Sequence, residues 1–178
     1  MTRPLLVSTI IALLMAVAAA PARAQTSFLV SGGLSAPVSD LGNVADIGYN
    51  AAAGLSFGGT TVPIGARLEV GYNGLGYKGG GGDVRIITGI ANAVFNVGTA
   101  KDAPYLIAGL GAYNRSSGTS TFGYGSGKTV IGINGGAGLR FPLSGLSTFF
   151  EARYHVMLGS RTDGTNYQFI PITFGIAF

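Results

Sequence analysis

Large apolar residues alternate with small or polar residues along several stretches of the chain, most regularly at its C-terminus. There one parity holds Ile170, Ile172, Phe174, Ile176 and Phe178, and the other holds Pro171, Thr173, Gly175 and Ala177. A period of two residues is typical of a β-strand whose two faces meet different environments. The same alternation recurs over residues 63–76 and 148–159. The pattern therefore predicts an all-β chain.

Turn-rich clusters divide residues 25–178 into eight runs of about 10 to 14 residues, long enough for a tilted strand to cross a membrane. The predicted strands are 26–35, 48–58, 63–76, 85–97, 104–115, 128–141, 148–159 and 167–178. Short turns alternate with longer connections, which include 40–47 and 116–127. We predict an eight-stranded antiparallel up-and-down transmembrane β-barrel, with its longer loops outside the cell.

The charged residues well inside these strands lie on the parity opposite the large apolar residues. An Arg or Lys on the lipid face costs about 2–4 kcal/mol at the bilayer midplane, so these charges are expected to face inward. Buried charges need partners. We predict a structural polar network in a closed lumen, without a wide pore, formed by Arg67, Glu69, Asn134, Arg140, Glu151, Arg153 and His155. Strands 85–97 and 104–115 carry apolar and small residues on both faces, so their inward sets stay open.

Aromatic residues gather near the ends of the predicted strands, as they do at the two interfaces of membrane barrels. Toward the longer loops these are Tyr49, Tyr72, Tyr77, Tyr113 and Tyr167, and toward the short turns Phe57, Phe95, Tyr105, Phe141, Phe150 and Phe178. We predict two aromatic belts. The composition agrees with dispersed hydrophobicity in strands, since the chain has 31 Gly, 10% charged residues and a mean hydropathy of +0.44.

The N-terminus reads as a secretory signal over residues 1–24, with a basic start, an apolar run over 5–20 and cleavage between Ala24 and Gln25. Residues 25–178 then form the barrel domain, which is expected in the outer membrane of a Gram-negative bacterium. Lys and Arg number 11, and losing Arg3 and Arg23 leaves nine against seven Asp and Glu. Nucleic-acid binding is not expected, because no run of basic residues offers a clustered patch.

One group of residues could support catalysis. Glu151, Arg153 and His155 are spaced at i, i+2 and i+4, so they lie on one face of the predicted strand. A carboxylate could orient a histidine base, and this leaves open a lipid A-modifying hydrolase on the same scaffold. Such a site must face lipid, whereas the parity turns His155 inward, and the nearest downstream hydroxyl is Ser160. The chain has no Cys and one His, so no metal or other cofactor is expected.

Four segments together resemble the family of small outer-membrane β-barrel domains, of the OmpA and OmpX type. They are Pro104–Tyr113 (PYLIAGLGAY), Gly135–Pro142 (GGAGLRFP), Phe150–His155 (FEARYH) and Ile170–Phe178 (IPITFGIAF). The resemblance covers essentially all of residues 25–178 and implies a barrel without an appended peptidoglycan-binding domain. Phe174, Ile176 and Phe178 resemble the C-terminal signal that the barrel-assembly machinery reads. Most relatives of this type have no defined activity.

The sequence thus favours a monomeric outer-membrane protein with a structural or surface-interaction role and no enzymatic activity. Its expected partners are outer-membrane lipid, lipopolysaccharide and, through the last strand, the barrel-assembly machinery. Besides the hydrolase, a second alternative to this interpretation is a soluble secreted barrel that binds a small apolar ligand, as lipocalins do. That alternative predicts apolar residues inside the barrel and polar residues outside, opposite to the alternation in three of the predicted strands.

Overall fold

The computed structural model describes residues 25–58, 63–98, 103–119, 123–125, 127–143, 146–159 and 166–178. The predicted signal peptide, residues 1–24, lies outside the described residues. The elements are β1 (Gln25–Val38), α2 (Ser39–Val44), β2 (Gly48–Gly58), β3 (Ile64–Gly76), β4 (Asp83–Asn96), β5 (Pro104–Thr119), β6 (Gly123–Tyr124), β7 (Lys128–Leu143), β8 (Leu146–Met157) and β9 (Tyr167–Ala177).

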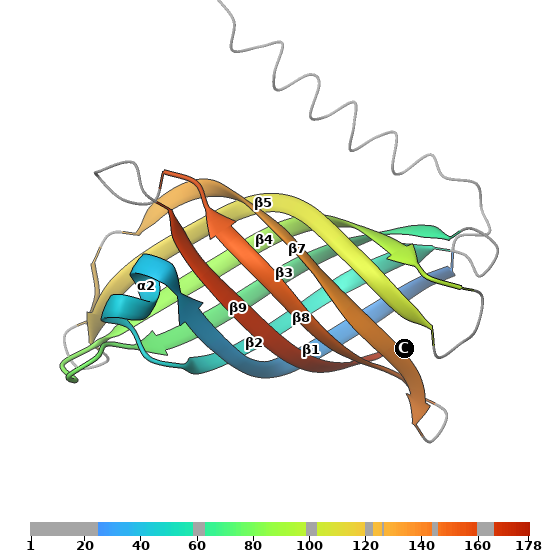
Figure 1. Cartoon of the computed structure of the whole chain (residues 1–178), viewed down its shortest axis with the longest axis horizontal. Helices are drawn as coiled ribbons and strands as arrows, with labels where there is room; N and C mark the ends of the chain where they lie inside the picture. Colours follow the sequence, from blue (N-terminus) through green and yellow to red (C-terminus); the bar gives the residue numbers. More distant parts are fainter. Residues whose placement is uncertain are drawn as a thin grey trace, which may run out of the picture.

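Among the described residues, eight long strands form one closed antiparallel barrel, in which each strand pairs with its neighbours in the chain (Figure 1). The two-residue strand β6 only extends the end of β5. The predicted eight-stranded up-and-down barrel is therefore confirmed. Three local differences appear at the loop end: β1 continues to Val38, a helix occupies part of the expected connection 40–47, and β5 with β6 extends into the expected connection 116–127.

The barrel closes where β1 pairs with β9, in a register that runs from Leu29 opposite Ala177 to Val38 opposite Gln168. Beyond the last strand residue, Phe28 and Phe178 exchange two backbone hydrogen bonds of 2.8 and 2.9 Å. Their ring centroids lie 5.4 Å apart. The first and last strands are thus joined over their length, so the sheet has no open edge at this seam.

The outer surface of the barrel is apolar. Large side chains on every long strand project from it, including Leu34, Val70, Leu110, Ile131 and Ile172. Water would disfavour so continuous an apolar surface, whereas hydrocarbon accommodates it. Among the described residues, no helix combines the length and hydropathy needed to span a membrane.

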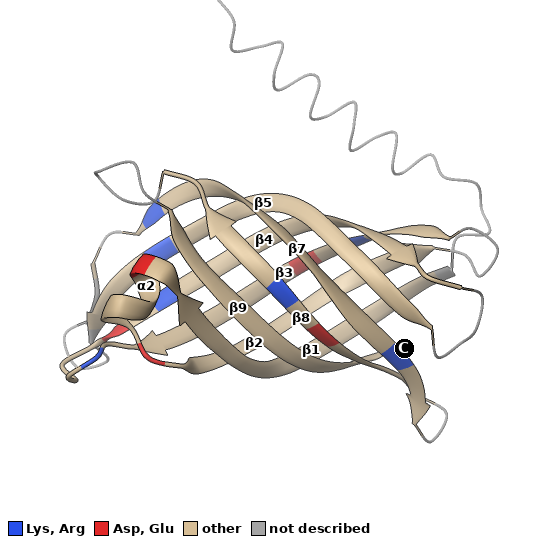
Figure 2. Cartoon of the chain, in the orientation of Figure 1, with Lys and Arg blue, Asp and Glu red and all other residues tan. Residues whose placement is uncertain are grey.

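The interior of the barrel is layered. An apolar cluster at the loop end contains Leu41, Ala45, Leu75, Val84, Ile86, Ile90, Tyr113, Met157 and Phe169. A second cluster toward the turn end contains Leu29, Val94, Tyr105, Ile107 and Phe149. Charged residues of β3 and β8 lie between the two clusters, and Figure 2 shows charged positions in the middle of the barrel and toward its ends. The predicted polar lumen is therefore a mixed one, with apolar clusters on either side of its charged middle layer. The inward residues of β4, which the alternation left open, are apolar at Val84, Ile86, Ile90 and Val94 and polar at Thr88 and Asn92.

Helix α2 covers part of the interior at the loop end. Its Leu41 is fully buried in the apolar cluster, and Ala45 follows it there. The hairpin between β3 and β4 holds the helix in place: Lys78 donates from Nζ to the carbonyl oxygen of Gly42 at 2.6 Å and from its backbone N–H to that of Val44 at 3.0 Å. The burial of Leu41 thus helps to order part of the connection 40–47, which the sequence predicted to be a loop.

Candidate functional site

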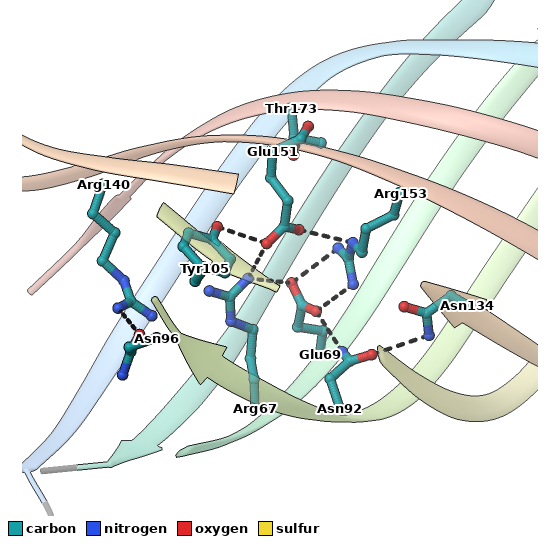
Figure 3. A network of polar contacts seen from close by, with 10 residues as sticks. All are labelled: Arg67, Glu69, Asn92, Asn96, Tyr105, Asn134, Arg140, Glu151, Arg153 and Thr173. Carbon is teal, nitrogen blue, oxygen red and sulfur yellow. Dashed lines mark hydrogen bonds and ion pairs between the residues drawn. The ribbon is translucent and has the colours of Figure 1, made fainter. Parts of the chain in front are cut away.

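Four charged side chains form a cluster inside the barrel, which we call the charged belt: Arg67 and Glu69 on β3, and Glu151 and Arg153 on β8. Each pair is spaced i and i+2, so both members point to the inside of the barrel. Strands β3 and β8 are separated by three long strands in either direction around the sheet. The two pairs therefore face each other directly across the lumen (Figure 3).

The ion pairs of the belt join the two sides of the barrel. Arg67 Nη1 lies 2.8 Å from Glu151 Oε2, and Arg153 Nη1 lies 2.7 Å from Glu69 Oε2. Within β8, Arg153 Nε lies 2.8 Å from Glu151 Oε1. A longer contact of 3.9 Å joins Arg67 to Glu69. The belt carries two positive and two negative charges, and its side chains are 0 to 6% exposed.

Neutral polar groups from other strands complete the belt (Figure 3). The Tyr105 hydroxyl donates to Glu151 Oε2 at 2.7 Å, and the Asn92 amide donates to Glu69 Oε2 at 2.9 Å. The Asn134 amide in turn donates to Asn92 Oδ1 at 3.0 Å. Because each carboxylate accepts bonds from a guanidinium and from a neutral donor, most of the cost of burying these charges is offset.

Glycines on the neighbouring strands make room for the side chains that fill the lumen. A Cβ atom on Gly138 of β7 would lie 2.3 Å from Cζ of Tyr105, and one on Gly175 of β9 would lie 2.3 Å from Cζ of Phe149. Both rings in turn contact Arg67, whose guanidinium carbon lies 5.5 Å from the Tyr105 centroid and 5.2 Å from that of Phe149. The narrow lumen is packed with side chains at this level.

The structure does not join Arg140 to the charged belt. Its Nη1 donates to Asn96 Oδ1, and its guanidinium carbon lies 4.5 Å from the centroid of the Tyr105 ring. Among the described residues it has no carboxylate partner. Arg140 thus lies nearer the turn end, on the other side of Tyr105 from the belt (Figure 3).

His155 points inward, as its parity indicated, but it binds no carboxylate among the described residues. Its Nδ1 lies 2.9 Å from the Tyr113 hydroxyl, and its ring stacks on Phe169 with a centroid separation of 4.8 Å. The carboxylate-oriented histidine considered from the sequence therefore does not form with Glu151. Ser160, the nearest downstream hydroxyl, lies outside the described residues.

Two tyrosines assigned from the sequence to the aromatic belts lie fully inside the barrel, and two more, Tyr77 and Tyr167, pack against the apolar cluster at the loop end; the prediction was wrong for these four. Tyr105 and Tyr113 are both fully buried, one bonded to Glu151 and the other to His155. Both faces of β5 carry apolar and small residues, so the alternation could not indicate which face points into the barrel. The available signal was the glycines of β7: Cβ atoms on Gly138 and Gly132 would overlap the rings of Tyr105 and Tyr113.

The C-terminal residues singled out from the sequence lie on the outer surface. Phe174 and Phe178 are exposed, and Ile176 is half-buried between them. The Phe174 ring lies 6.1 Å from that of Phe141 on β7, across the outer face of β8. Within the described part of the chain, no group of three or more His, Asp or Glu side chains could hold a metal ion.

The fold is that of the small eight-stranded outer-membrane β-barrels. Neisserial surface protein A is similar in structure, with a TM-score of 0.71 and 18% identity, over 86% of this chain and 97% of that one. Ail, the attachment invasion locus protein of Yersinia pestis, was solved with the heparin analogue sucrose octasulfate; it gives a TM-score of 0.49 and 19% identity, over 88% of this chain and 99% of that one. The N-terminal β-barrel domain of Pseudomonas aeruginosa OprF gives 0.46 and 17%, over 87% of this chain and 99% of that domain. No family model and no curated protein matches the sequence.

Proposed function

We propose that this chain is a monomeric outer-membrane barrel of a Gram-negative bacterium, with a structural or surface-interaction role and no enzymatic activity. Residues 1–24 direct export and are removed between Ala24 and Gln25. The observation that carries the proposal is the combination of an apolar outer surface with a charged belt closed on itself inside. This arrangement suits hydrocarbon outside and a packed lumen within.

The packed interior supports a barrel that does not conduct as a wide pore. The charged belt occupies the middle of the lumen, and an apolar cluster lies on either side of it. A hydrated solute would have to displace paired charges and two apolar layers. Eight strands enclose an interior only just wide enough for their own side chains. The role therefore resides at the surface of the barrel rather than in transport through it.

The loop end is the part of the barrel best suited to surface contacts. Figure 2 shows charged positions gathered at this end. In the sequence, the helix α2, the hairpin after β3 and the adjoining strand ends contain Lys78, Arg85, Arg115 and Lys128 with Asp40, Asp46 and Asp83. Arg115 and Lys128 are direct cross-strand partners. The Arg115 guanidinium carbon lies 4.8 Å from the Tyr167 centroid, and Lys128 Nζ donates to the carbonyl oxygen of Gly159 at 3.0 Å, so both cations are held in place. A phosphate of lipopolysaccharide near this pair would be attracted by both charges. We therefore propose lipopolysaccharide as the contact at this end.

The last strand supports a second interaction, with the barrel-assembly machinery. Its residues Phe174, Ile176 and Phe178 point outward in an apolar row. The backbone pairing of β9 with β1 leaves this outward row accessible. In this proposal the barrel-assembly machinery recognises the row while the chain is inserted, and the row faces lipid afterwards.

The lipocalin-like alternative is disfavoured by the same outer surface. A soluble barrel would expose residues such as Leu110 and Ile131 to water, and both are prominent on the outside. The apolar side chains inside the barrel pack against one another in two clusters, and Leu41 and Ala45 at the α2 end belong to the cluster at the loop end.

The test is fractionation of bacteria that express the full chain, followed by electrophoresis of boiled and unboiled samples. The proposal expects the protein in the outer-membrane fraction, with a band whose mobility changes on heating. A matched chain that lacks residues 2–24 should stay in the cytoplasm. The purified protein in lipid vesicles should not release a small entrapped sugar. A soluble periplasmic or secreted product without a heat shift would overturn the proposal.

A further inference from the structure

A small polar cavity lies inside the barrel, between the charged belt and the apolar cluster at the loop end. Its volume is about 20 Å³. The wall includes side chains that can donate or accept hydrogen bonds, among them Asn73, Thr88, Arg153 and His155. Ala52 of β2 completes the side facing them. The cavity is therefore small, and seven of its twelve lining residues carry polar side chains, which distinguishes it from a purely apolar packing defect.

One polar atom in this wall has no partner within the described residues. His155 is 3% exposed, and its Nδ1 is bonded to the Tyr113 hydroxyl at 2.9 Å. Its other ring nitrogen, Nε2, makes no hydrogen bond to the described protein atoms. Leaving a buried nitrogen in this state is unfavourable. The imidazole therefore requires a further partner, and His155 lines the cavity.

The chemistry of histidine narrows the choice of partner. If Tyr113 donates to Nδ1, then Nε2 carries the proton and needs an acceptor; if Nδ1 carries the proton, then Nε2 needs a donor. A water molecule can serve in either case, because it both donates and accepts. The volume also suits it, since about 10–15 Å³ accommodates one water.

The backbone around the cavity leaves further hydrogen-bonding capacity. Where β8 pairs with β9, Ala152 lies opposite Ile172 and His155 lies opposite Phe169, in one continuous register. The strand residues between these two positions are nevertheless not paired. Pro171, which would lie opposite Arg153, has no N–H to donate to the ladder. The interruption falls in the wall of the cavity, since both residues line it.

We propose that this cavity is a binding site for a single ordered water, which bonds to Nε2 of His155 and to polar groups of the wall. The water connects the charged belt with the polar side chains toward the loop end, where Ser35 donates to Asn73 at 3.1 Å. A cation is disfavoured because Arg153 lies in the wall, and an anion is disfavoured because Glu69 does.

The test uses the fact that His155 is the only histidine in the chain, so its imidazole signals need no assignment by elimination. Isotope-labelled protein without a histidine tag is folded in detergent micelles. Cross-peaks between the imidazole carbon-bound protons and water are then recorded by nuclear Overhauser spectroscopy. A long-lived bound water gives cross-peaks of the sign expected for a slowly tumbling complex. The measurement is repeated in Tyr113→Phe, which removes the hydroxyl whose exchange could relay the signal.

Two further variants locate the water. Ala52→Val places two methyl groups in the cavity and leaves the imidazole as reporter, whereas Ala53→Val alters the next residue, which points to the outside. We expect the cross-peak in the unaltered protein, in Tyr113→Phe and in Ala53→Val, and its loss in Ala52→Val. A heat-shifted band verifies that each variant is folded. Absence of the cross-peak in the unaltered protein, or its persistence in Ala52→Val, overturns the proposal.

Discussion

Arg67 and Glu151 lie 84 residues apart in the chain, yet Nη1 of the one and Oε2 of the other are 2.8 Å apart inside the barrel. Arg153 and Glu69 have the same separation in sequence and meet at 2.7 Å. Both ion pairs cross the lumen between strands that share no backbone hydrogen bonds. The direct contacts between β3 and β8 are therefore made by side chains alone.

Removing one charge from this arrangement should be more damaging than removing a pair. Glu151→Gln leaves the 3.9 Å contact to Glu69 as the one ion pair of Arg67 among the described residues. We expect a loss of about 3–5 kcal/mol in the free energy of unfolding, since breaking one partner of a buried ion pair leaves an uncompensated charge. Urea unfolding in lipid vesicles, followed by the heat-shifted band because the chain has no Trp, measures it.

The control for this prediction is a double-mutant cycle. Arg67→Met and the combined Arg67→Met/Glu151→Gln variant complete it. The double variant should lose less stability than the sum of the two single variants. Strict additivity would mean that the two side chains do not interact across the lumen.

A methyl group at Gly138 should destabilise the barrel, because its Cβ would lie 2.3 Å from a Tyr105 ring that is held by Glu151. We expect Gly138→Ala to cost about 1–3 kcal/mol, the usual effect of overpacking a filled interior. Gly89→Ala is the matched control, because its Cβ would meet nothing within 4 Å. Equal urea midpoints for the two variants would contradict the packing described for Tyr105.

A charge on the outer surface should be costly in the middle of a strand and cheap near its end. Leu110 lies near the middle of β5, and Leu143 is the last residue of β7; both are exposed. With lipid around the barrel, Leu110→Arg is expected to cost about 2–4 kcal/mol and Leu143→Arg about 0–1 kcal/mol. Unfolding in lipid vesicles gives both values. A similar cost at the two positions would argue against a hydrocarbon layer centred on Leu110.

Helix α2 should contribute to stability through one side chain. Leu41→Ala removes a fully buried leucine from the apolar cluster at the loop end, for an expected cost of about 2–5 kcal/mol. Val44→Ala, in the same helix but exposed, should change the free energy of unfolding by about 0.5 kcal/mol or less. If the two variants unfold at the same urea concentration, α2 does not depend on Leu41 for its position.

His155→Ala should leave lipid A unchanged. The imidazole faces the interior, where it contacts Tyr113 and Phe169, and lipid cannot reach it there. Mass spectrometry of lipid A from cells that express the unaltered chain, the variant or an empty vector should give one and the same profile. A modification that appears with the unaltered chain and disappears with the variant would restore the hydrolase alternative.

The alternation of residue types was sufficient to predict the barrel and the inward direction of the charges on β3 and β8. It could not predict which charges meet, because partners across a lumen depend on how eight strands are staggered around it. For that reason Arg67 and Glu151 could be grouped from the sequence but not paired, and Arg140 was grouped with them although it binds Asn96 instead.

The features missed from the sequence have two physical causes. On β5 both faces carry apolar or small side chains, so Tyr105 and Tyr113 could be placed equally well at the membrane interface or in the interior. Only the glycines on the adjacent strand β7 distinguish the membrane interface from the interior as the location of these rings. Helix α2 was missed because it is a single short segment with one buried leucine, too brief for a helical period to register.

The span of the ion pairs across the lumen has a consequence for the order of events during folding. Hairpins can form as soon as neighbouring strands are available, but Arg67 and Glu69 on β3 cannot meet their partners until β8 has joined the sheet. Such distant contacts contribute late, after the entropy of closing a long loop has been lost. We expect Arg67 and Glu69 to face water without their partners on β8 in intermediates that lack the last two strands, and the final closure of the barrel to be a cooperative step.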